Sequence, residues 1–134
     1  MAELLQAVRT MKSWDEQTVQ EDGSGRKMAT AVVTYDYAEP LVGSSTVEYA
    51  MLYFSPTKAA FVGYEHVAAS YGDRAGSFVL RHEGIFDNGG AQIAVQVVAD
   101  SPTGTFAGMS GTGTIAPDPT DPMKGSLALE WRMA

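Results

Sequence analysis

The chain has 134 residues, 45% hydrophobic and 19% charged, so its size and composition indicate one globular domain spanning residues 1–134. Its net charge of −7 and its sparse lysines and arginines argue against a nucleic-acid partner, because phosphate binding needs clustered cations. It has no cysteine for disulfides or thiolate metal sites, and no apolar run approaches the ~20 residues of a membrane helix, so we expect a cytoplasmic protein with no membrane partner.

The N-terminal residues 2–13 admit two interpretations. Leu4, Leu5, Val8 and Met11 have a helical spacing. The competing interpretation is an alternating strand with Leu4, Gln6, Val8, Thr10 and Lys12 on one side. We predict a strand, because the rest of the chain is β and a helix here would leave a sheet edge open. Residues 15–27 are polar and contain glycine, so they predict a long loop. Residues 28–38 are rich in β-branched and aromatic side chains and predict the second strand.

Residues 43–98 predict four consecutive strands joined by three tight turns. The strands cover 43–54, 59–71, 76–86 and 91–98. Asn88-Gly89 is a strong hairpin signal, because a type I′ turn needs positive φ at both central residues. Pro56 and Gly72 mark the other two turns.

The C-terminal part predicts two further strands, 112–116 and 125–133, separated by a loop at 117–124. Before them, residues 99–113 predict a folded connection in which Phe106 and Met109 fill the core. Eight short antiparallel strands without a helix indicate an all-β sandwich or closed barrel. The meander order of the central strands favours an eight-stranded antiparallel β-barrel, whose interior holds side chains or one small ligand.

The residues that share a face follow from the turn centres, provided that each central hairpin has an even loop. Turns centred on 56–57 and 73–74 place Glu48 opposite Glu65, and Glu65 opposite His82. The last turn places His82 opposite Val95. Three ionisable residues then lie among apolar side chains on the face that we expect to line the interior. The opposite face carries Tyr49, Tyr53, Tyr64, His66, Arg81, Glu83, Gln92 and Gln96.

Glu48, Glu65 and His82 are the candidate catalytic residues. Two facing carboxylates should not both ionise easily in an apolar interior, so one glutamate pKa should rise, and the histidine could share the proton. Such a group can serve as general acid and base. A satisfied buried network that fixes strand register is the commoner role of such residues. A metal site is the third alternative, and we do not predict it, because the usual ligand spacings are absent.

Large apolar residues of the same barrel are the candidate ligand-binding residues. Trp14 lies where the first strand meets the long loop, and it either lines the barrel mouth or, the favoured interpretation, plugs the barrel end. Trp131 is expected inside with Leu127 and Leu129. The candidate ligand-binding set is Trp14, Leu52, Phe61, Phe78, Leu80, Val95 and Trp131.

Tyr49, Met51, Tyr53 and Tyr64 form a stripe on the expected outer face. Aromatic and methionine side chains are enriched at subunit interfaces. The stripe therefore predicts a homo-oligomer.

Several motifs along the chain resemble a bacterial protein family of unknown function that is grouped with the allene oxide cyclase-like barrels. They are KSWDEQ (12–17), TVEYAMLY (46–53), FVGYEHV (61–67), GSFVLRHEGIFDNGG (76–90) and TGTFAGMSGTGTI (103–115). The resemblance implies an eight-stranded antiparallel barrel with a small central cavity. Allene oxide cyclases, dirigent proteins and some polyketide cyclases use similar barrels to steer reactive apolar substrates, which is an analogy of fold alone.

Three functions follow as hypotheses, none of which needs a cofactor. The first is an isomerase or cyclase that encloses a small, largely apolar substrate and excludes water from it. The second is a non-catalytic barrel that binds a small hydrophobic molecule. The third is a solidly packed structural or interaction protein.

Overall fold

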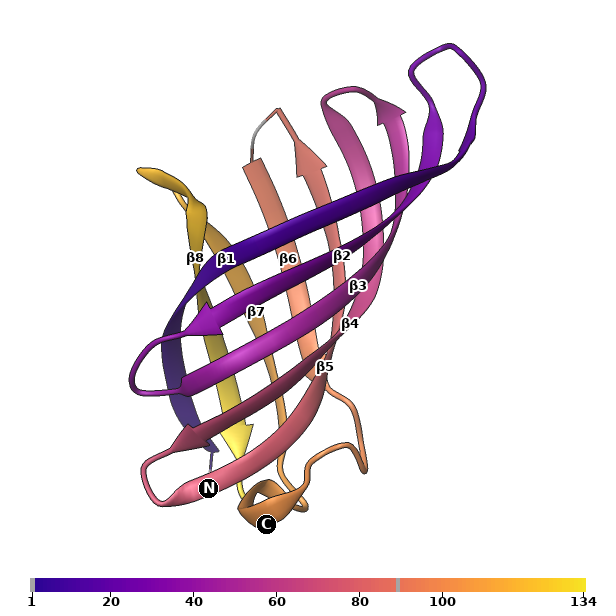
Figure 1. Ribbon diagram of the computed structural model, residues 1–134. Helices are drawn as coiled ribbons and strands as arrows, with labels where there is room; N and C mark the ends of the chain where they lie inside the picture. Colours follow the sequence, from indigo (N-terminus) through magenta and orange to yellow (C-terminus); the bar gives the residue numbers. More distant parts are fainter. Residues whose placement is uncertain (1, 89) are drawn as a thin grey trace.

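The computed structural model describes residues 2–88 and 90–134. Eight antiparallel strands follow one another in chain order around a closed barrel, in which β1 also pairs with β8 (Figure 1). The strands are β1 (Ala2–Glu21), β2 (Lys27–Tyr37), β3 (Val42–Ser55), β4 (Lys58–Tyr71), β5 (Arg74–Asp87), β6 (Gly90–Val97), β7 (Ser110–Asp118) and β8 (Asp121–Arg132), with one 3-10 turn, η1 (Gly104–Phe106). The predicted all-β, eight-stranded antiparallel architecture is confirmed. None of the described residues forms a helix long and apolar enough to cross a membrane.

Two loops are shorter than the sequence predicts. Most of residues 15–27 belongs to β1, because β1 pairs with β2 as far as Glu21↔Lys27 and absorbs the irregular stretch in two register shifts. β7 and β8 likewise extend across most of the predicted 117–124 loop and leave only residues 119–120 between them. Backbone pairing with a neighbour therefore makes strands of polar segments that would otherwise favour loops.

A β-bulge in β3 changes which of its side chains face the interior. The turn at residues 56–57 is where the sequence predicts it, with Ser55 paired to Lys58, but the register shifts between Tyr53 and Ser55. A one-residue shift turns a whole strand over. The predicted inward face of β3 is therefore wrong, and its odd-numbered residues from Ser45 to Met51 are the buried ones.

The lumen is occupied by side chains, which form two apolar clusters. One lies toward the end of the barrel that carries η1 and both termini, and it includes Phe78, Phe106 and Trp131 (Figure 1). Phe106 and Met109 are buried, so the predicted filling of the core by residues 99–113 is confirmed. The other cluster includes Met51 and Phe61 and lies toward the opposite end. We call this the hairpin end, because the β1–β2, β3–β4, β5–β6 and β7–β8 turns lie there. An eight-stranded barrel has an interior that side chains can fill.

Candidate functional site

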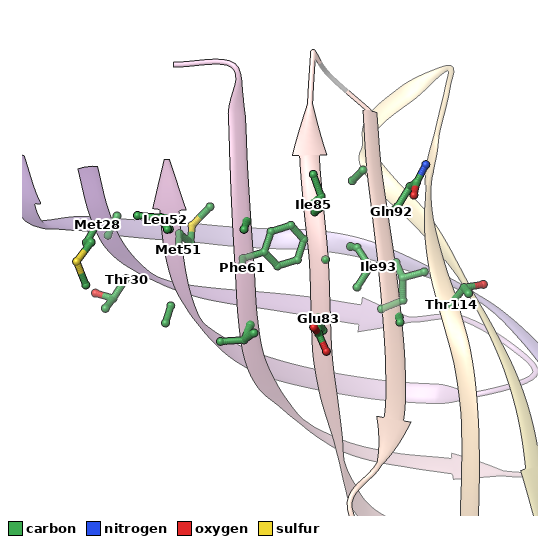
Figure 2. Close-up of a pocket in the computed structure, with 18 of the residues that line it drawn as sticks. Met28, Thr30, Met51, Leu52, Phe61, Glu83, Ile85, Gln92, Ile93 and Thr114 are labelled. Carbon is green, nitrogen blue, oxygen red and sulfur yellow. The ribbon is translucent and has the colours of Figure 1, made fainter. Parts of the chain in front are cut away.

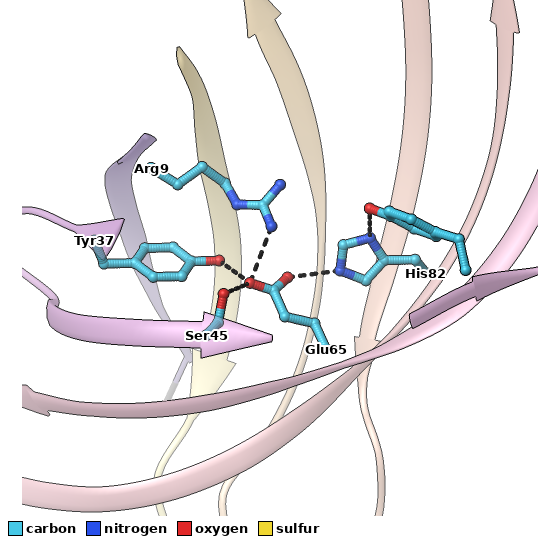
Figure 3. Close-up of polar contacts among 6 residues, drawn as sticks. Arg9, Tyr37, Ser45, Glu65 and His82 are labelled. Carbon is cyan, nitrogen blue, oxygen red and sulfur yellow. Dashed lines mark hydrogen bonds and ion pairs between the residues drawn. The ribbon is translucent and has the colours of Figure 1, made fainter. Parts of the chain in front are cut away.

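A buried polar network lies between the two apolar clusters. Glu65 on β4 accepts hydrogen bonds through Oε2 from the Tyr37 hydroxyl at 2.7 Å and from the Ser45 hydroxyl at 2.6 Å (Figure 3). Its Oε1 lies 2.7 Å from His82 Nε2. The other ring nitrogen of His82, Nδ1, lies 3.0 Å from the Tyr49 hydroxyl. The network joins β2, β3, β4 and β5, and the side chains of Glu65 and His82 are 0% exposed.

Arg9 on β1 supplies the positive charge of this network. Its Nη2 lies 3.0 Å from Glu65 Oε2, and its guanidinium stacks 3.6 Å from the centre of the Tyr35 ring. Neither Nε nor Nη2 has a hydrogen-bond partner among the described residues. The contact with Glu65 is therefore a close ion pair that does not follow an N–H direction, and the stacking on tyrosine supplies a further cation–π attraction.

The predicted group of Glu48, Glu65 and His82 is only partly assembled. Glu65 and His82 meet as predicted, although β4 and β5 pair two residues away from the predicted register, with Glu65 opposite Leu80. The predicted pairing of His82 with Val95 is confirmed. Glu48 is exposed on the outer face opposite Tyr64, because the β3 bulge turns it outward. Glu48 is therefore not part of the buried network.

Sequence reasoning missed the other members of the network, which are Arg9, Tyr37 and Ser45 at Glu65 and Tyr49 at His82. A usable signal existed for Arg9, since it continues the alternation of Leu5 and Ala7, which are both buried. Tyr49 lies on the inward side of β3, opposite to the predicted side, and Ser45 shares that inward side.

The electrostatics contradict the expected rise in a glutamate pKa. Burial raises the pKa of Glu65, but Arg9, the His82 ring and the Ser45 hydroxyl more than offset burial and lower it from 4.5 to about 2. Burial lowers the pKa of Arg9, while the Glu65 carboxylate raises it and gives a net increase. Burial and the charge of Glu65 together raise the pKa of Tyr37 well above its usual value. Glu65 is therefore a carboxylate, Arg9 is a cation, and Tyr37 is a neutral donor.

This arrangement matches a strand-linking network better than an acid–base site. The Glu65 oxygens are already in contact with three hydrogen-bonding side chains and Arg9, and both ring nitrogens of His82 have partners. A general acid or base must come within hydrogen-bonding distance of its substrate. Residues that are fully covered by other side chains do not meet that requirement in this conformation.

The predicted ligand-binding residues do not surround one shared cavity. Phe78, Leu80, Val95 and Trp131 are buried in the cluster at the η1 end. Trp131 packs with Leu127 and Leu129, as predicted. Phe61 belongs to the cluster at the hairpin end.

Trp14 and Leu52 are each 44% exposed. Trp14 donates from Nε1 to Glu16 Oε1 at 3.2 Å. Trp14 is opposite the buried Val33 of β2, and its interpretation as a plug or as a lining of the barrel mouth stays a prediction.

The outer face of β3 differs from the predicted stripe. Tyr49 and Met51 are buried, and Tyr53 is half-buried in contact with the cluster at the hairpin end. Among the predicted residues Tyr64 is the exposed one, at 58%. The outward residues in this part of β3 are instead Ala50, Leu52 and Phe54. The outer wall is therefore apolar, as predicted, but other side chains than the predicted ones make it so.

An open hollow of about 1190 Å³ runs across this outer wall, and we call it the outer trough (Figure 2). It follows a row of mostly small outward residues that pair across six strands. That row is Thr30, Ala50, Val62, Glu83, Ala94 and Thr114. Six adjacent strands give the row a length of ~24 Å at ~4.8 Å per strand.

Larger side chains form the two banks of the trough. Toward the hairpin end, Met28, Leu52 and Ile85 make an apolar bank. Toward the η1 end, Glu48, Tyr64 and Arg81 make a polar bank. Outward residues of one strand repeat every ~6.8 Å, so the banks are ~13 Å apart.

The trough is a feature of the outside rather than of the lumen. Its exposed lining side chains, such as Met28 and Ile85, point outward. Tyr49 and Phe86 point inward, one as a member of the cluster at the hairpin end and the other packed against it. Neither is among the described residues that line the trough, whereas both would be expected there if the trough were part of the lumen. Inward residues such as Phe61 line it because their strands form its floor (Figure 2).

Comparison with known proteins adds a family and a fold. The family model described as "Protein of unknown function (DUF3224)" matches residues 6–129. A crystal structure of a protein with unknown function from the DUF3224 family of Shewanella oneidensis MR-1 is similar, with a TM-score of 0.73 and 19% identity over 98% of this chain and 99% of that one. No curated protein matches the chain. The predicted resemblance to a family of unknown function is confirmed, and the grouping with allene oxide cyclase-like barrels stays a prediction.

Proposed function

This chain belongs to the DUF3224 family of proteins of unknown function, and from that premise we propose that it is a non-catalytic barrel that binds a small, largely apolar molecule on its outer wall. The observation that carries the proposal is the lining of the outer trough. Glu83 is the one charged residue among the described residues that line it. The volume of the outer trough, about 1190 Å³, slightly exceeds the ~300–1,000 Å³ of common ligand sites.

The exposed apolar bank makes the binding of an apolar molecule to this wall favourable. Met28, Leu52 and Ile85 are each between 44% and 53% exposed. Side chains of this kind that adjoin one another in a hollow are a usual mark of a binding surface. Covering them removes apolar area from water at ~25 cal/mol per Å², and a ligand that fills the trough obtains that gain without opening the barrel.

Two observations favour this function over an enclosing isomerase or cyclase. Side chains occupy the lumen at the positions where a substrate would be enclosed. Glu65 and His82, the acid–base candidates, have their polar atoms engaged with each other and with Arg9, Tyr37 and Tyr49. The second hypothesis therefore gains support, with its site moved from the lumen to the outer wall.

Binding of the uncharged dye Nile red, followed by its fluorescence, tests the proposal. Ala50 lies in the floor of the trough, so Ala50→Glu places a charge there and should weaken dye binding at least tenfold. Ala68→Glu is the matched control, because Ala68 is an outward, exposed residue of β4 outside the trough. Equal dye affinity of Ala50→Glu and the wild type would overturn the proposal.

A further inference from the structure

A second hollow, of about 570 Å³, adjoins the outer trough on its polar bank. The two hollows share Thr30, Ala50 and Val62 as lining residues, so they form one continuous surface. The second hollow differs in chemistry, because its remaining outward side chains are Thr46, Glu48, Tyr64, His66, Val79 and Arg81. A molecule that extends from one hollow into the other passes from an apolar to a polar environment.

Three hydrogen-bond donors converge in this polar hollow because of the strand register. Tyr64 on β4 is directly opposite Arg81 on β5, and His66 is opposite Val79. Directly opposite residues have Cβ atoms ~5 Å apart and diagonal neighbours lie ~7–8 Å apart. The phenol of Tyr64, the imidazole of His66 and the guanidinium of Arg81 are therefore within reach of one small group.

The charge of Arg81 is available to an incoming group. Its Nη1 lies 3.2 Å from Glu83 Oε2, and the two side chains are 44% and 66% exposed. Exposed pairs of this kind contribute little net stability, so another anion can replace the Glu83 carboxylate at small cost. The planar fork of a guanidinium matches a carboxylate in two parallel hydrogen bonds.

Glu48 restricts where a negative group can lie in the hollow. Glu48 is opposite Tyr64 on the side away from Arg81, so it and Arg81 are separated by two strand spacings, or ~10 Å. That distance is about one Debye length at ordinary salt. An anion is therefore favoured on the β5 side of Tyr64 and disfavoured on the β3 side.

We infer that the polar hollow is the head-group site for an amphipathic carboxylate, held by Arg81 with Tyr64 and His66 beside it, whose apolar part lies in the outer trough. The inference rests on the proposed function, since the trough supplies the binding of the apolar part. It adds the ligand class and the orientation, with the carboxylate over β4 and β5 and the chain toward the hairpin end.

Displacement of Nile red by decanoate and by decan-1-ol tests this inference, because the two probes share a chain and differ in the head group. In the Arg81→Gln variant, decanoate should bind about tenfold more weakly, while decan-1-ol should bind as it does to the wild type. Arg132→Gln is the control, since it removes the same charge from an exposed residue of β8 outside both hollows. It should leave both affinities unchanged.

The outcomes separate this inference from the proposed function. Equal loss of decanoate affinity in Arg81→Gln and Arg132→Gln, or none in either, would overturn the head-group site while binding in the trough stands. Failure of both probes to displace the dye, together with unaltered dye binding by Ala50→Glu, would overturn the proposed function and this inference with it.

Discussion

Glu65 carries a negative charge in the middle of the lumen, where it is 0% exposed. An isolated carboxylate in such a place would be very unstable. Arg9, Tyr37, Ser45 and His82 compensate the lost hydration, and they come from four other strands. The charge is therefore tolerated only when those strands are correctly paired, which links one residue to the register of half the barrel.

Replacement of Glu65 measures that link. Glu65→Gln leaves Arg9 buried without its counter-charge, so we expect the free energy of unfolding at pH 7 to fall by roughly 3–5 kcal/mol. Glu48→Gln, an exposed change of the same chemistry, should stay within about 0.5 kcal/mol of the wild type. Urea denaturation of both variants checks the difference. Equal stability of Glu65→Gln and the wild type would mean that the ion pair contributes nothing.

The low pKa of Glu65 also sets a dependence on pH. Its pKa falls from 4.5 to about 2 in the folded state, so the contribution to stability is fully present above pH 4.5 and is lost as pH falls through about 2. We expect the stability difference between the wild type and Glu65→Gln to shrink across this window. Denaturant unfolding of both proteins at a series of pH values measures it, and a constant difference would contradict the assignment.

At the scale of the strand, the bulge near Phe54 determines which side chains of β3 face the interior. The turn at Pro56 and the alternation of β3 are both legible in the sequence. The bulge cannot be predicted from the sequence, because it depends on the register in which β3 pairs with β4. The error on β4 and β5 was two residues, so Glu65 and His82 kept their face, whereas the one-residue error on β3 reversed Glu48 and Tyr49.

Gly63 shows how closely neighbouring strands pack around the network. It lies opposite Tyr49 and His82, and a Cβ there would overlap the carbonyl oxygen of Glu48 and lie 2.8 Å from Tyr49 Cδ1. We expect Gly63→Ala to lower the free energy of unfolding by roughly 1–3 kcal/mol, because the Tyr49 ring must move.

Gly90→Ala is the matched control for this strand-scale test. Its Cβ would meet nothing closer than 3.6 Å, so it should be within about 0.5 kcal/mol of the wild type. Thermal or urea unfolding compares the two, and equal losses would show that close packing at Gly63 is not the cause.

At the scale of the whole molecule, three large exposed side chains lie on the same wall as the trough. Leu52, Phe54 and Tyr64 are all between 44% and 58% exposed. We therefore expect these three side chains to form the contact in the predicted self-association. We expect reversible association at high micromolar concentration, weakened by Leu52→Glu and by saturating decan-1-ol, which covers the same wall.

Sedimentation velocity measures this association. Leu4→Glu is the control, because Leu4 is exposed on β1 outside the trough. Association that survives Leu52→Glu and disappears with Leu4→Glu would place the contact on another face.

The fold could be predicted because its determinants are local. Tight turns, alternating strands and the absence of a helix signal each follow from neighbouring residues. The outer trough could not, since it depends on which residues of six strands align in one row, and one undetected bulge misplaces an entire strand. Arg9 was missed for a related reason: its partner Glu65 is more than fifty residues away in the sequence.

Intermolecular NOEs from bound decan-1-ol to the methyl groups of the protein test most directly whether ligands bind the outer wall. We expect NOEs to Leu52, Val62 and Ile85, whose side chains face outward along the trough. The buried methyl groups of Val33, Leu80 and Val95 should show none. NOEs to those three, without contacts to the first set, would place the ligand in the lumen and contradict the account.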